Sequence, residues 1–230
     1  MALGRLQKLA AADMLERFDS RVVSASALRF LRACQSRAEF HLAGGAALSG
    51  AHLAHRLSGD LDLFCHDSAR MRHLVSQLEA IAAEAGGTSR IDRDSGTHVR
   101  AQFAFADGAL EVDVVYESLP DLASPETLEG VVVESLDDLR AAKLTCLLSR
   151  SEPRDLVDVL FLERAGYRPE DDLALALRKD AGVDPGVLAW LLRSFPVTPL
   201  PIMLLPLNEA ELRAYRDALA ERLRALAVPI

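Results

Sequence analysis

The segment HLAGGAALSGAHLAHRLSGDLDLF, residues 41–64, decides the fold of this chain. A short, partly alternating run at 39–43 predicts a strand that leads directly into the pair Gly44-Gly45. The small residues of 46–54 then predict a helix. Because glycine has no Cβ, its backbone can approach a phosphate closely, and a helix N-terminus offers free N–H groups to an anion. The segment therefore indicates an anion site between a strand and a helix.

Two carboxylates lie at the start of the next predicted strand, in which apolar and polar residues alternate over 61–65. Side chains alternate faces along a strand, so Asp60 and Asp62 point the same way. Two carboxylates held a few ångströms apart repel each other unless a cation lies between them. Oxygen ligands on a rigid strand suit Mg²⁺ or Mn²⁺.

A third carboxylate follows on a later predicted strand. Asp113 could complete a two-metal site, in which one ion holds phosphates and the other lowers the pKa of an attacking hydroxyl. Glu111 alternates onto the same face and is the alternative third ligand; Asp113 is preferred because it lies deeper in its apolar run. The order of glycine pair, Asp-x-Asp and third acid is a much stronger signal than any of its parts.

Helical and strand-like patterns alternate through the rest of the N-terminal half. Asp107-Gly108 lies between two alternating runs and is typical of a hairpin. We expect helices at 3–33 and 68–85, the second ended by Gly86-Gly87, and strands at 98–106, 109–116 and 131–134.

From residue 135 onward the pattern becomes helical. We expect helices at 135–148, 154–165, 171–179, 185–193 and 208–226. Asn208 with Glu211 has the spacing of a capping box. The chain is therefore predicted to divide into an α/β core with an N-terminal helix, residues 1–134, and a helical domain, residues 135–230.

Composition limits the functional classes. Half of the 230 residues are hydrophobic, as in a globular protein, and the net charge of −8 argues against binding nucleic acid by bulk attraction, although a local basic pocket remains possible. Cys34, Cys65 and Cys146 form no CxxC pair and predict reduced thiols rather than a disulfide framework. No signal peptide or membrane span is recognisable, so we expect a cytoplasmic protein.

Two further groups of residues have competing interpretations. Arg29, Arg32 and Arg37 form either a stripe that faces RNA or, as we prefer, a solvated helix face. His52 and His55 are three apart and suggest zinc, but no Cys or third His stands at ligand spacing, which favours packing or surface roles.

Residues 41–64 resemble the signature of the DNA polymerase β-like nucleotidyltransferases, and within them the AbiEii/AbiGii-type toxin family, which includes the MenT toxins. The run His55-Arg56-Leu57-Ser58 before Asp60 matches that branch. A second matching block is LRAAKLTCLLSR at 139–150, followed by RDLVD at 154–158. The resemblance extends from about residue 20 to the C-terminus.

This resemblance implies a polymerase β-like core with a mixed sheet, followed by a helical half. It also implies Mg²⁺-dependent transfer of a nucleoside monophosphate from NTP to an acceptor hydroxyl. The family's functional positions correspond to Asp60 and Asp62 for metal, Gly44 and Gly45 for triphosphate, and Lys143 and Asp155 in the helical half. Some members act on tRNA 3′ ends and are encoded beside an antitoxin. We expect the two halves to form a cleft in which Lys143 contacts the triphosphate.

The chain departs from the family pattern at three positions. Ala46 stands where a Thr or Ser commonly binds phosphate, and Ser58 could supply a hydroxyl nearby. The gap between Gly45 and Asp60 is slightly long. Arg154 replaces the usual Lys before the last acidic residue; it keeps the charge and has a fork suited to phosphate.

The residues of the helical half have a simpler interpretation as well. Lys143 and Arg150 share a helix face, and cations on a helix are usually just solvated. Asp155 and Asp158 could merely pair with Arg150 or Arg154. The resemblance favours roles for Lys143 and Asp155, and less so for Asp158.

Two alternatives to an RNA-directed toxin remain. A transferase that adds AMP to a small molecule such as an aminoglycoside fits the acidic composition. A non-catalytic module that binds NTP or RNA is the other, which the retained Asp60, Asp62, Asp113 and Lys143 disfavour.

Overall fold

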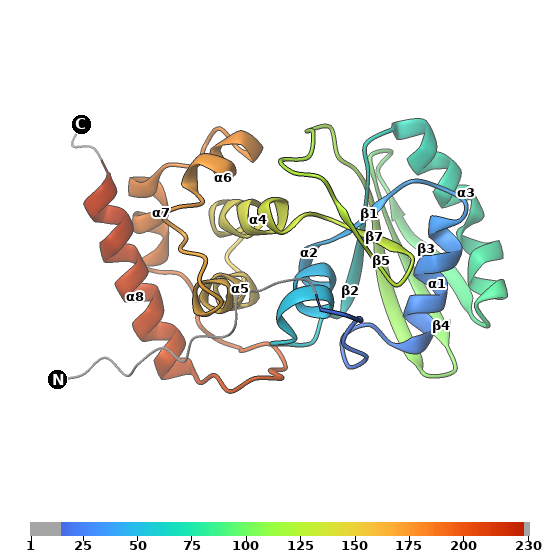
Figure 1. Ribbon diagram of the computed structural model, residues 1–230, viewed down its shortest axis with the longest axis horizontal. Coiled ribbons are helices and arrows are strands. Elements are labelled where there is room, and N and C mark those ends of the chain that lie inside the picture. The colour runs from blue at the N-terminus through green and yellow to red at the C-terminus, as the bar shows by residue number, and fades with distance from the viewer. Residues whose placement is uncertain (1–14, 228–230) are drawn as a thin grey trace. The chain divides into compact units, whose positions relative to one another are not determined.

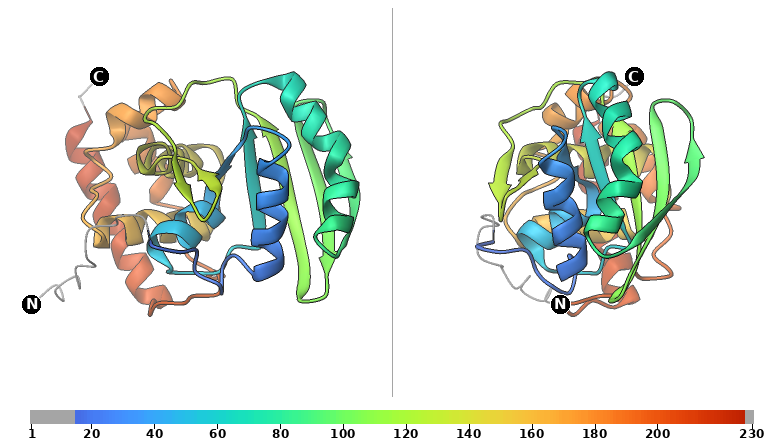
Figure 2. Two further views of the ribbon diagram at one scale, coloured as in Figure 1. Left: turned by 45° about the vertical axis from the view of Figure 1, so that its right-hand side comes forward. Right: turned by 90° about the vertical axis from the view of Figure 1, so that its right-hand side faces the viewer.

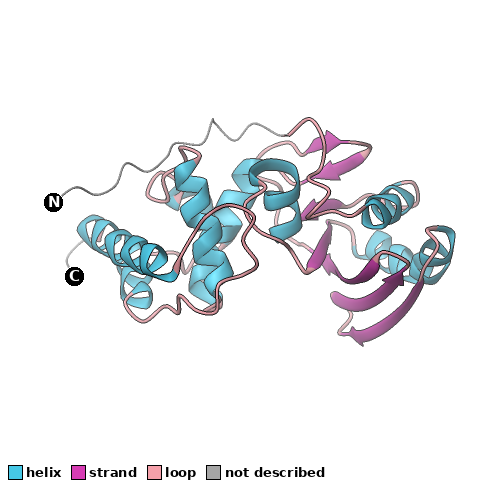
Figure 3. Ribbon diagram, turned by 90° about the horizontal axis from the view of Figure 1, so that it is seen from below, coloured by secondary structure: helices cyan, strands magenta, loops and turns pink. Residues whose placement is uncertain are grey.

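The computed structural model describes residues 15–227. Their contacts divide them into an N-terminal unit that ends at Ser135 and a C-terminal unit that begins at Leu136. The strands of the sheet all belong to the N-terminal unit, and the C-terminal unit is built from helices. Figure 3 distinguishes helices and strands by colour. The fold is therefore α/β with a mixed sheet, as the sequence predicts.

A seven-stranded sheet, counted over residues 15–227, forms the centre of the N-terminal unit, in the order β3-β4-β5-β2-β1-β7-β6 (Figure 1). The strands are β1 (His41–Ala43), β2 (Asp60–Cys65), β3 (Thr88–Asp94), β4 (His98–Phe105), β5 (Gly108–Tyr116), β6 (Glu126–Leu128) and β7 (Val131–Val133). The pairs β2–β5 and β1–β7 are parallel and the others antiparallel. Strand β2 thus pairs with β5, although a helix and two further strands lie between them in the sequence.

Helices α1 (Ala25–Gln35) and α3 (Ser68–Glu84) lie side by side on one face of this sheet (Figure 2). The Phe30 ring of α1 packs on Phe103 of β4 with 4.5 Å between ring centroids. Leu61 and Leu63 of β2 are buried. Burial of this apolar face supplies most of the driving force for folding the unit.

The opposite side chains of the same strands are polar, and they carry the candidate site. Connected to β1 is the short helix α2 (Gly44–Ala47), which continues into a π-helical segment, η1 (Leu48–Leu53). This segment ends at Ala54 with a left-handed φ of 48°. π-helical turns are rare and occur often at functional sites.

The C-terminal unit is a helical assembly. Its helices are α4 (Leu136–Ser149), α5 (Pro153–Arg164), α6 (Leu173–Lys179), α7 (Pro185–Leu192) and α8 (Glu209–Leu226). Asn208 caps α8, because its side chain accepts a hydrogen bond from the Glu211 N–H at 3.0 Å. The Glu211 carboxylate pairs with Arg164. The cap on α8 is therefore confirmed.

Three expectations about secondary structure were wrong. Of the predicted helix 3–33, residues 3–14 lie outside the described residues, and in the remainder only α1 is helical. The helix begins after Ser24, which has an extended backbone and whose side chain accepts a hydrogen bond from the Ala27 N–H. Strands β3 and β6 were not predicted. The helix after the glycine pair begins at Gly44 rather than at Ala46.

Among residues 15–227 no helix combines the length and the apolar character needed to cross a membrane. The cysteines are free thiols. Burial raises the pKa of the Cys65 thiol to about 11, and it raises the pKa of Cys34 as well. These two thiols are therefore protonated and unreactive at neutral pH.

Candidate active site

The register of β2 against β5 gathers carboxylates on one face of the sheet. Asp60 pairs with Glu111 and Asp62 with Asp113, in parallel strands whose partner residues point to the same side. One ligand atom from each of Asp60, Glu111 and Asp113 lies within 4.8 Å of the others. Both residues weighed as the third acid therefore lie close to Asp60.

Asp113 is the most buried of these acids, and β4 supplies its partners. The Arg100 guanidinium donates to both of its oxygens, from Nε at 2.9 Å and from a terminal nitrogen at 2.8 Å, and His98 Nε2 lies 2.7 Å from Oδ1. Burial alone would raise the pKa of Asp113, but the hydrogen bonds from Arg100 and His98 outweigh it, so the pKa is lowered. Asp113 is therefore an ionised carboxylate.

Arg100 also lies 3.3 Å from Glu111, and hydrogen bonding to Asp113 together with the negative charge of Asp113, Glu111 and Asp60 raises the pKa of its guanidinium. The negative charges of at least three carboxylates therefore act on the single guanidinium of Arg100. The sequence did not point to Arg100 or His98 as part of the site, because their contact with Asp113 depends on the pairing of β4 with β5.

The glycine pair is in direct contact with the acidic strand. Gly44 has φ +65°, and a Cβ at this position would lie 1.8 Å from the Asp62 Oδ2 atom. Only glycine fits here, because any side chain would collide with the carboxylate and the backbone is left-handed. The predicted anion turn and the predicted acidic strand therefore form one site.

Arg56 and Ser58 fill the space beside Gly45. A Cβ on Gly45 would lie 2.7 Å from an Arg56 guanidinium nitrogen and 2.8 Å from the Ser58 hydroxyl. Arg56 is 2% exposed and donates to the Leu57 carbonyl at 2.9 Å, whereas Ser58 Oγ donates to Asp60 at 3.1 Å. No pattern in the sequence assigns Arg56 a role of its own. A buried guanidinium at a glycine turn is a fitting partner for a phosphate.

Ala46, the departure from the family pattern, is fully buried in α2. Its methyl group belongs to the packing of that helix, so in this chain the polar groups around the glycine turn come from the backbone and from Arg56 and Ser58.

The sheet face that carries Asp60, Asp62, Glu111 and Asp113 is called the acidic face, and its donors fit a magnesium-type ion. They are carboxylate oxygens on neighbouring rigid strands, the ligands that Mg²⁺ and Mn²⁺ prefer. The two oxygens of Asp113 already accept hydrogen bonds, but a carboxylate oxygen has a second lone pair that can face a cation.

Lys143 of α4 lies buried between two carboxylates of α5, at 2.8 Å from Asp158 and 3.4 Å from Asp155. The lysine side chain is 3% exposed and both aspartates are fully buried. The interpretation of Lys143 as a solvated cation was therefore wrong. The structure brings together the Lys143 and Asp155 of the family motif, with Asp158 as a third member.

Arg150 completes this group. Its Nε donates to Asp155 at 2.8 Å and a terminal nitrogen donates at 2.9 Å, as one of the simpler interpretations allowed. Arg154 instead pairs with Glu152. Ion pairs therefore connect the end of α4 with α5.

The other residues that the sequence singled out lie in or next to η1 and α1. His52 and His55 are buried in and next to η1, as the packing interpretation expects. The arginines of α1 and its end are bonded within the N-terminal unit, Arg29 to Ser26, Arg32 to Glu129 and Arg37 to Glu84.

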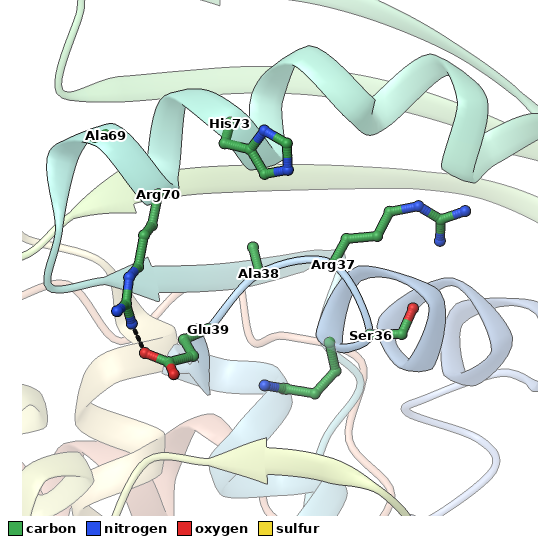
Figure 4. Close-up of a pocket in the computed structure, with 8 residues that line it drawn as sticks. Ser36, Arg37, Ala38, Glu39, Ala69, Arg70 and His73 are labelled. Atoms are coloured by element: carbon green, nitrogen blue, oxygen red, sulfur yellow. Dashed lines mark ion pairs between the residues drawn. The ribbon is translucent and has the colours of Figure 1, made fainter.

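A surface hollow of about 520 Å³ lies between the end of α1 and the start of α3 (Figure 4). Arg70 forms an ion pair with Glu39 at its margin, and Arg37 and His73 also line it. None of the described carboxylates of the acidic face lines this hollow, so it is separate from the candidate site.

A sheet face with clustered acids against a Gly-Gly turn, in a chain that continues into a helical unit, is an architecture of nucleotidyltransferases. A family model described as nucleotidyl transferase AbiEii toxin of type IV toxin–antitoxin systems matches residues 29–229. The chain belongs to this family of nucleotidyltransferase toxins. A comparison with curated proteins found no match.

Solved structures share the fold at low sequence identity. MenT4, a nucleotidyltransferase toxin from Mycobacterium tuberculosis H37Rv, is 17% identical with a TM-score of 0.64, over 88% of this chain and 86% of that one. A candidate nucleotidyltransferase from Helicobacter pylori is 22% identical with a TM-score of 0.58, over 86% and 92%. JHP933 from Helicobacter pylori is 21% identical with a TM-score of 0.55, over 86% and 89%.

The contact between Gly44 and Asp62 leads to a stability prediction. Gly44→Ala places a methyl group on the Asp62 carboxylate in a left-handed backbone, so we expect urea denaturation to show a loss of about 1–3 kcal/mol in unfolding free energy. Gly59→Ala is the matched control, because a Cβ there has no atom within 4 Å. Equal effects of the two substitutions would contradict the contact.

The lowered pKa of Asp113 predicts a pH-dependent stability. A carboxyl group whose pKa is lower in the folded state stabilises the fold above its unfolded pKa, and this stabilisation is lost as the pH falls through the folded pKa. We therefore expect Asp113→Asn to be less stable than the wild type at pH 7. The difference should narrow below about pH 4.

Thermal unfolding measured across pH 3–7 checks this expectation, with Asp92→Asn on the exposed strand β3 as control. A difference in stability between Asp113→Asn and the wild type that stays constant with pH would show that Arg100 and His98 do not favour the ionised carboxylate.

Proposed function

We propose that this protein is a Mg²⁺-dependent nucleotidyltransferase that moves a nucleoside monophosphate from NTP to an acceptor hydroxyl of tRNA or another RNA, in the cytoplasm, as the toxin partner of a cognate antitoxin. The observation that carries the proposal is the contact of the Gly44 turn with the acidic strand, beside the cluster of Asp60, Glu111 and Asp113. A phosphate-binding turn next to carboxylates brings the two parts that nucleotidyl transfer needs into one site.

The triphosphate site is proposed to form around the glycine pair. Gly44 and Gly45 let the backbone approach phosphate oxygens, and the buried Arg56 guanidinium next to Gly45 adds a fixed positive charge. We expect Ser58, which donates to Asp60, to link the phosphate-binding turn to the metal-binding strand.

Asp60, Asp62 and Asp113 are proposed to hold the metal, with Glu111 as an additional ligand on the same face. When bound, Mg²⁺ supplies charge for the phosphates and lowers the pKa of the attacking hydroxyl. Arg100 holds Asp113 in place through both carboxylate oxygens. The acceptor oxygen attacks the α-phosphorus in line, the bond from that phosphorus to the bridging oxygen breaks, and pyrophosphate leaves.

Lys143 and Asp155 are proposed to contribute from the C-terminal unit. Lys143 already has two carboxylate neighbours, so its charge is compensated before any nucleotide binds. We propose that the triphosphate shares this ammonium with Asp155 and Asp158. Asp155 then acts as a positioning residue, because its other partner, Arg150, donates to both of its oxygens and fixes their orientation.

Two classes of acceptor can be compared with the charge and the family of the chain. A net charge of −8 does not favour wide contact with RNA, and it suits a small cationic acceptor such as an aminoglycoside. Toxin-family membership favours a cellular RNA. The decisive experiment therefore offers both acceptors to the same enzyme.

Purified protein is incubated with each α-labelled NTP, Mg²⁺, and either total cellular RNA or an aminoglycoside mixture. We expect label on RNA in the tRNA size range. Asp60→Ala and Asp62→Ala should each lower transfer by at least about a thousandfold, because they remove ligands of the ion that stabilises the transition-state charge.

Asp92→Asn, which removes an exposed carboxylate from β3, is the matched control and should retain full transfer. Label found only on aminoglycoside would replace the RNA acceptor by the small-molecule alternative. Binding of NTP without transfer to any acceptor would favour a non-catalytic module, and unchanged Mg²⁺-dependent transfer in Asp62→Ala would overturn the metal assignment.

A further prediction separates the binding role of Lys143 from its structural role. Lys143→Met leaves Asp155 and Asp158 buried without this cation, which costs about 3–5 kcal/mol of stability. It also deletes a charge-assisted contact, so we expect NTP affinity to fall about tenfold or more by calorimetric titration.

Lys179→Met is the matched control, because Lys179 is another largely buried lysine of the same unit, pairs with Asp138 at 2.7 Å and has no proposed part in the transfer. This variant should lose stability but keep NTP affinity. An equal loss of affinity in both variants would assign Lys143 to folding alone.

A further inference from the structure

A second group of potential metal ligands lies in the N-terminal unit, at the opposite end of β2 from Asp60. His41 is the first residue of β1, His66 directly follows β2, and Asp121 lies in the loop between β5 and β6. One ligand atom from each lies within 4.8 Å of the others. Two imidazoles and a carboxylate are a donor set typical of zinc sites that have an open fourth position.

The distances within this group fit a tetrahedral ion. The Asp121 Oδ1 atom lies 3.0 Å from His66 Nε2 and 3.5 Å from His41 Nδ1. Ligands bound to zinc at about 2.0–2.1 Å in a tetrahedron are separated by about 3.3 Å. The two distances from Asp121 therefore lie just below and just above the edge length of a zinc tetrahedron.

The hydrogen bond at the far side of His66 supports the same conclusion. His66 Nδ1 lies 3.1 Å from the Glu117 carbonyl oxygen, which can only accept, so Nδ1 carries the hydrogen. With the hydrogen on Nδ1, Nε2 is the ring atom that faces the Asp121 oxygen, at 3.0 Å, and is in position to bind an ion together with it. Zinc-bound histidines commonly donate their other N–H to a backbone carbonyl in this way.

The group is accessible from the surface. A hollow of about 320 Å³ is lined by both histidines and by Phe40, Phe64 and Arg70 among others. The side chains are partly shielded, with 18% of His41, 33% of His66 and 27% of Asp121 exposed. An ion can therefore enter, and it would retain water in the fourth position.

This group is separate from the nucleotidyl transfer site. His41 pairs with Phe64 near the end of β2, whereas Ala43 pairs with Asp62. His66 follows Asp62 by four residues, which corresponds to about 13 Å along an extended strand. Metal binding by these three residues is therefore independent of the proposed function.

We propose that His41, His66 and Asp121 form a zinc-binding site that fastens the loop after β5 to the ends of β1 and β2. The first two ligands are fixed by the sheet, and Asp121 is the ligand through which the ion holds the loop. Carboxylate and imidazole donors favour Zn²⁺ over Mg²⁺, which prefers oxygen ligands and six-fold coordination.

Chelator-treated full-length protein is titrated with Zn²⁺, and with Co²⁺ as an optical probe. We expect one tight site, visible absorption bands typical of tetrahedral Co²⁺, and a higher unfolding temperature with Zn²⁺ than without it. His66→Ala and Asp121→Asn should each weaken Zn²⁺ binding at least about tenfold.

His73→Ala is the matched control, because His73 is an exposed histidine of the same unit on α3. It should leave Zn²⁺ affinity unchanged, as should Asp60→Ala on the acidic face. If His66→Ala fails to fold, His41→Gln and Asp121→Asn carry the test. Absence of a zinc-dependent signal in the wild type would overturn the proposal, as would a His66 ring that keeps both of its N–H hydrogens when Zn²⁺ is added. Equal loss of Zn²⁺ binding in His73→Ala or Asp60→Ala would also overturn it.

Discussion

The parallel pairing of β2 with β5 is the constraint on which the candidate site depends. It places Asp60 opposite Glu111 and Asp62 opposite Asp113, so four acidic side chains point to one face of the sheet. The opposite face is apolar and covered by α1 and α3, which fixes the register, because a slip by one residue would bury the acids. Hydrophobic packing on one face thus holds like charges together on the other.

Residues of the neighbouring strand β4 and of the glycine turn contact these carboxylates. Arg100 and His98 come from β4 and favour the ionised form of Asp113, while the missing side chain of Gly44 leaves room for the Asp62 carboxylate. In the C-terminal unit the described cations and carboxylates form ion pairs with one another, in a cluster of Lys143, Arg150, Asp155 and Asp158. Carboxylates gathered on one face of the sheet suit the binding of a cation, whereas paired charges suit the positioning of a side chain.

Much of this arrangement was predictable from local patterns. The glycine pair, the hairpin at Asp107-Gly108 and the Asn208 cap each follow from a few adjacent residues, and the structure confirms the hairpin and the cap. Strand β3 was not predicted, because its exposed polar residues have no alternation and it is a strand only through pairing with β4. The contacts of Arg100 with Asp113 and of Arg56 with the Gly45 turn likewise join segments that no single-sequence pattern connects. The burial of Lys143 depends on how α4 packs against α5, so the sequence identified the residue but not its surroundings.

Binding of Mn²⁺, measured by electron paramagnetic resonance in the presence of an NTP, tests the central claim most directly, because it observes the ion on the acidic face without requiring the acceptor. We predict that Asp60→Asn and Asp62→Asn each lower Mn²⁺ affinity at least about tenfold, while Asp92→Asn, on the exposed edge strand, binds like the wild type. Equal Mn²⁺ affinity in the wild type and in Asp62→Asn would contradict the placement of the ion on this face.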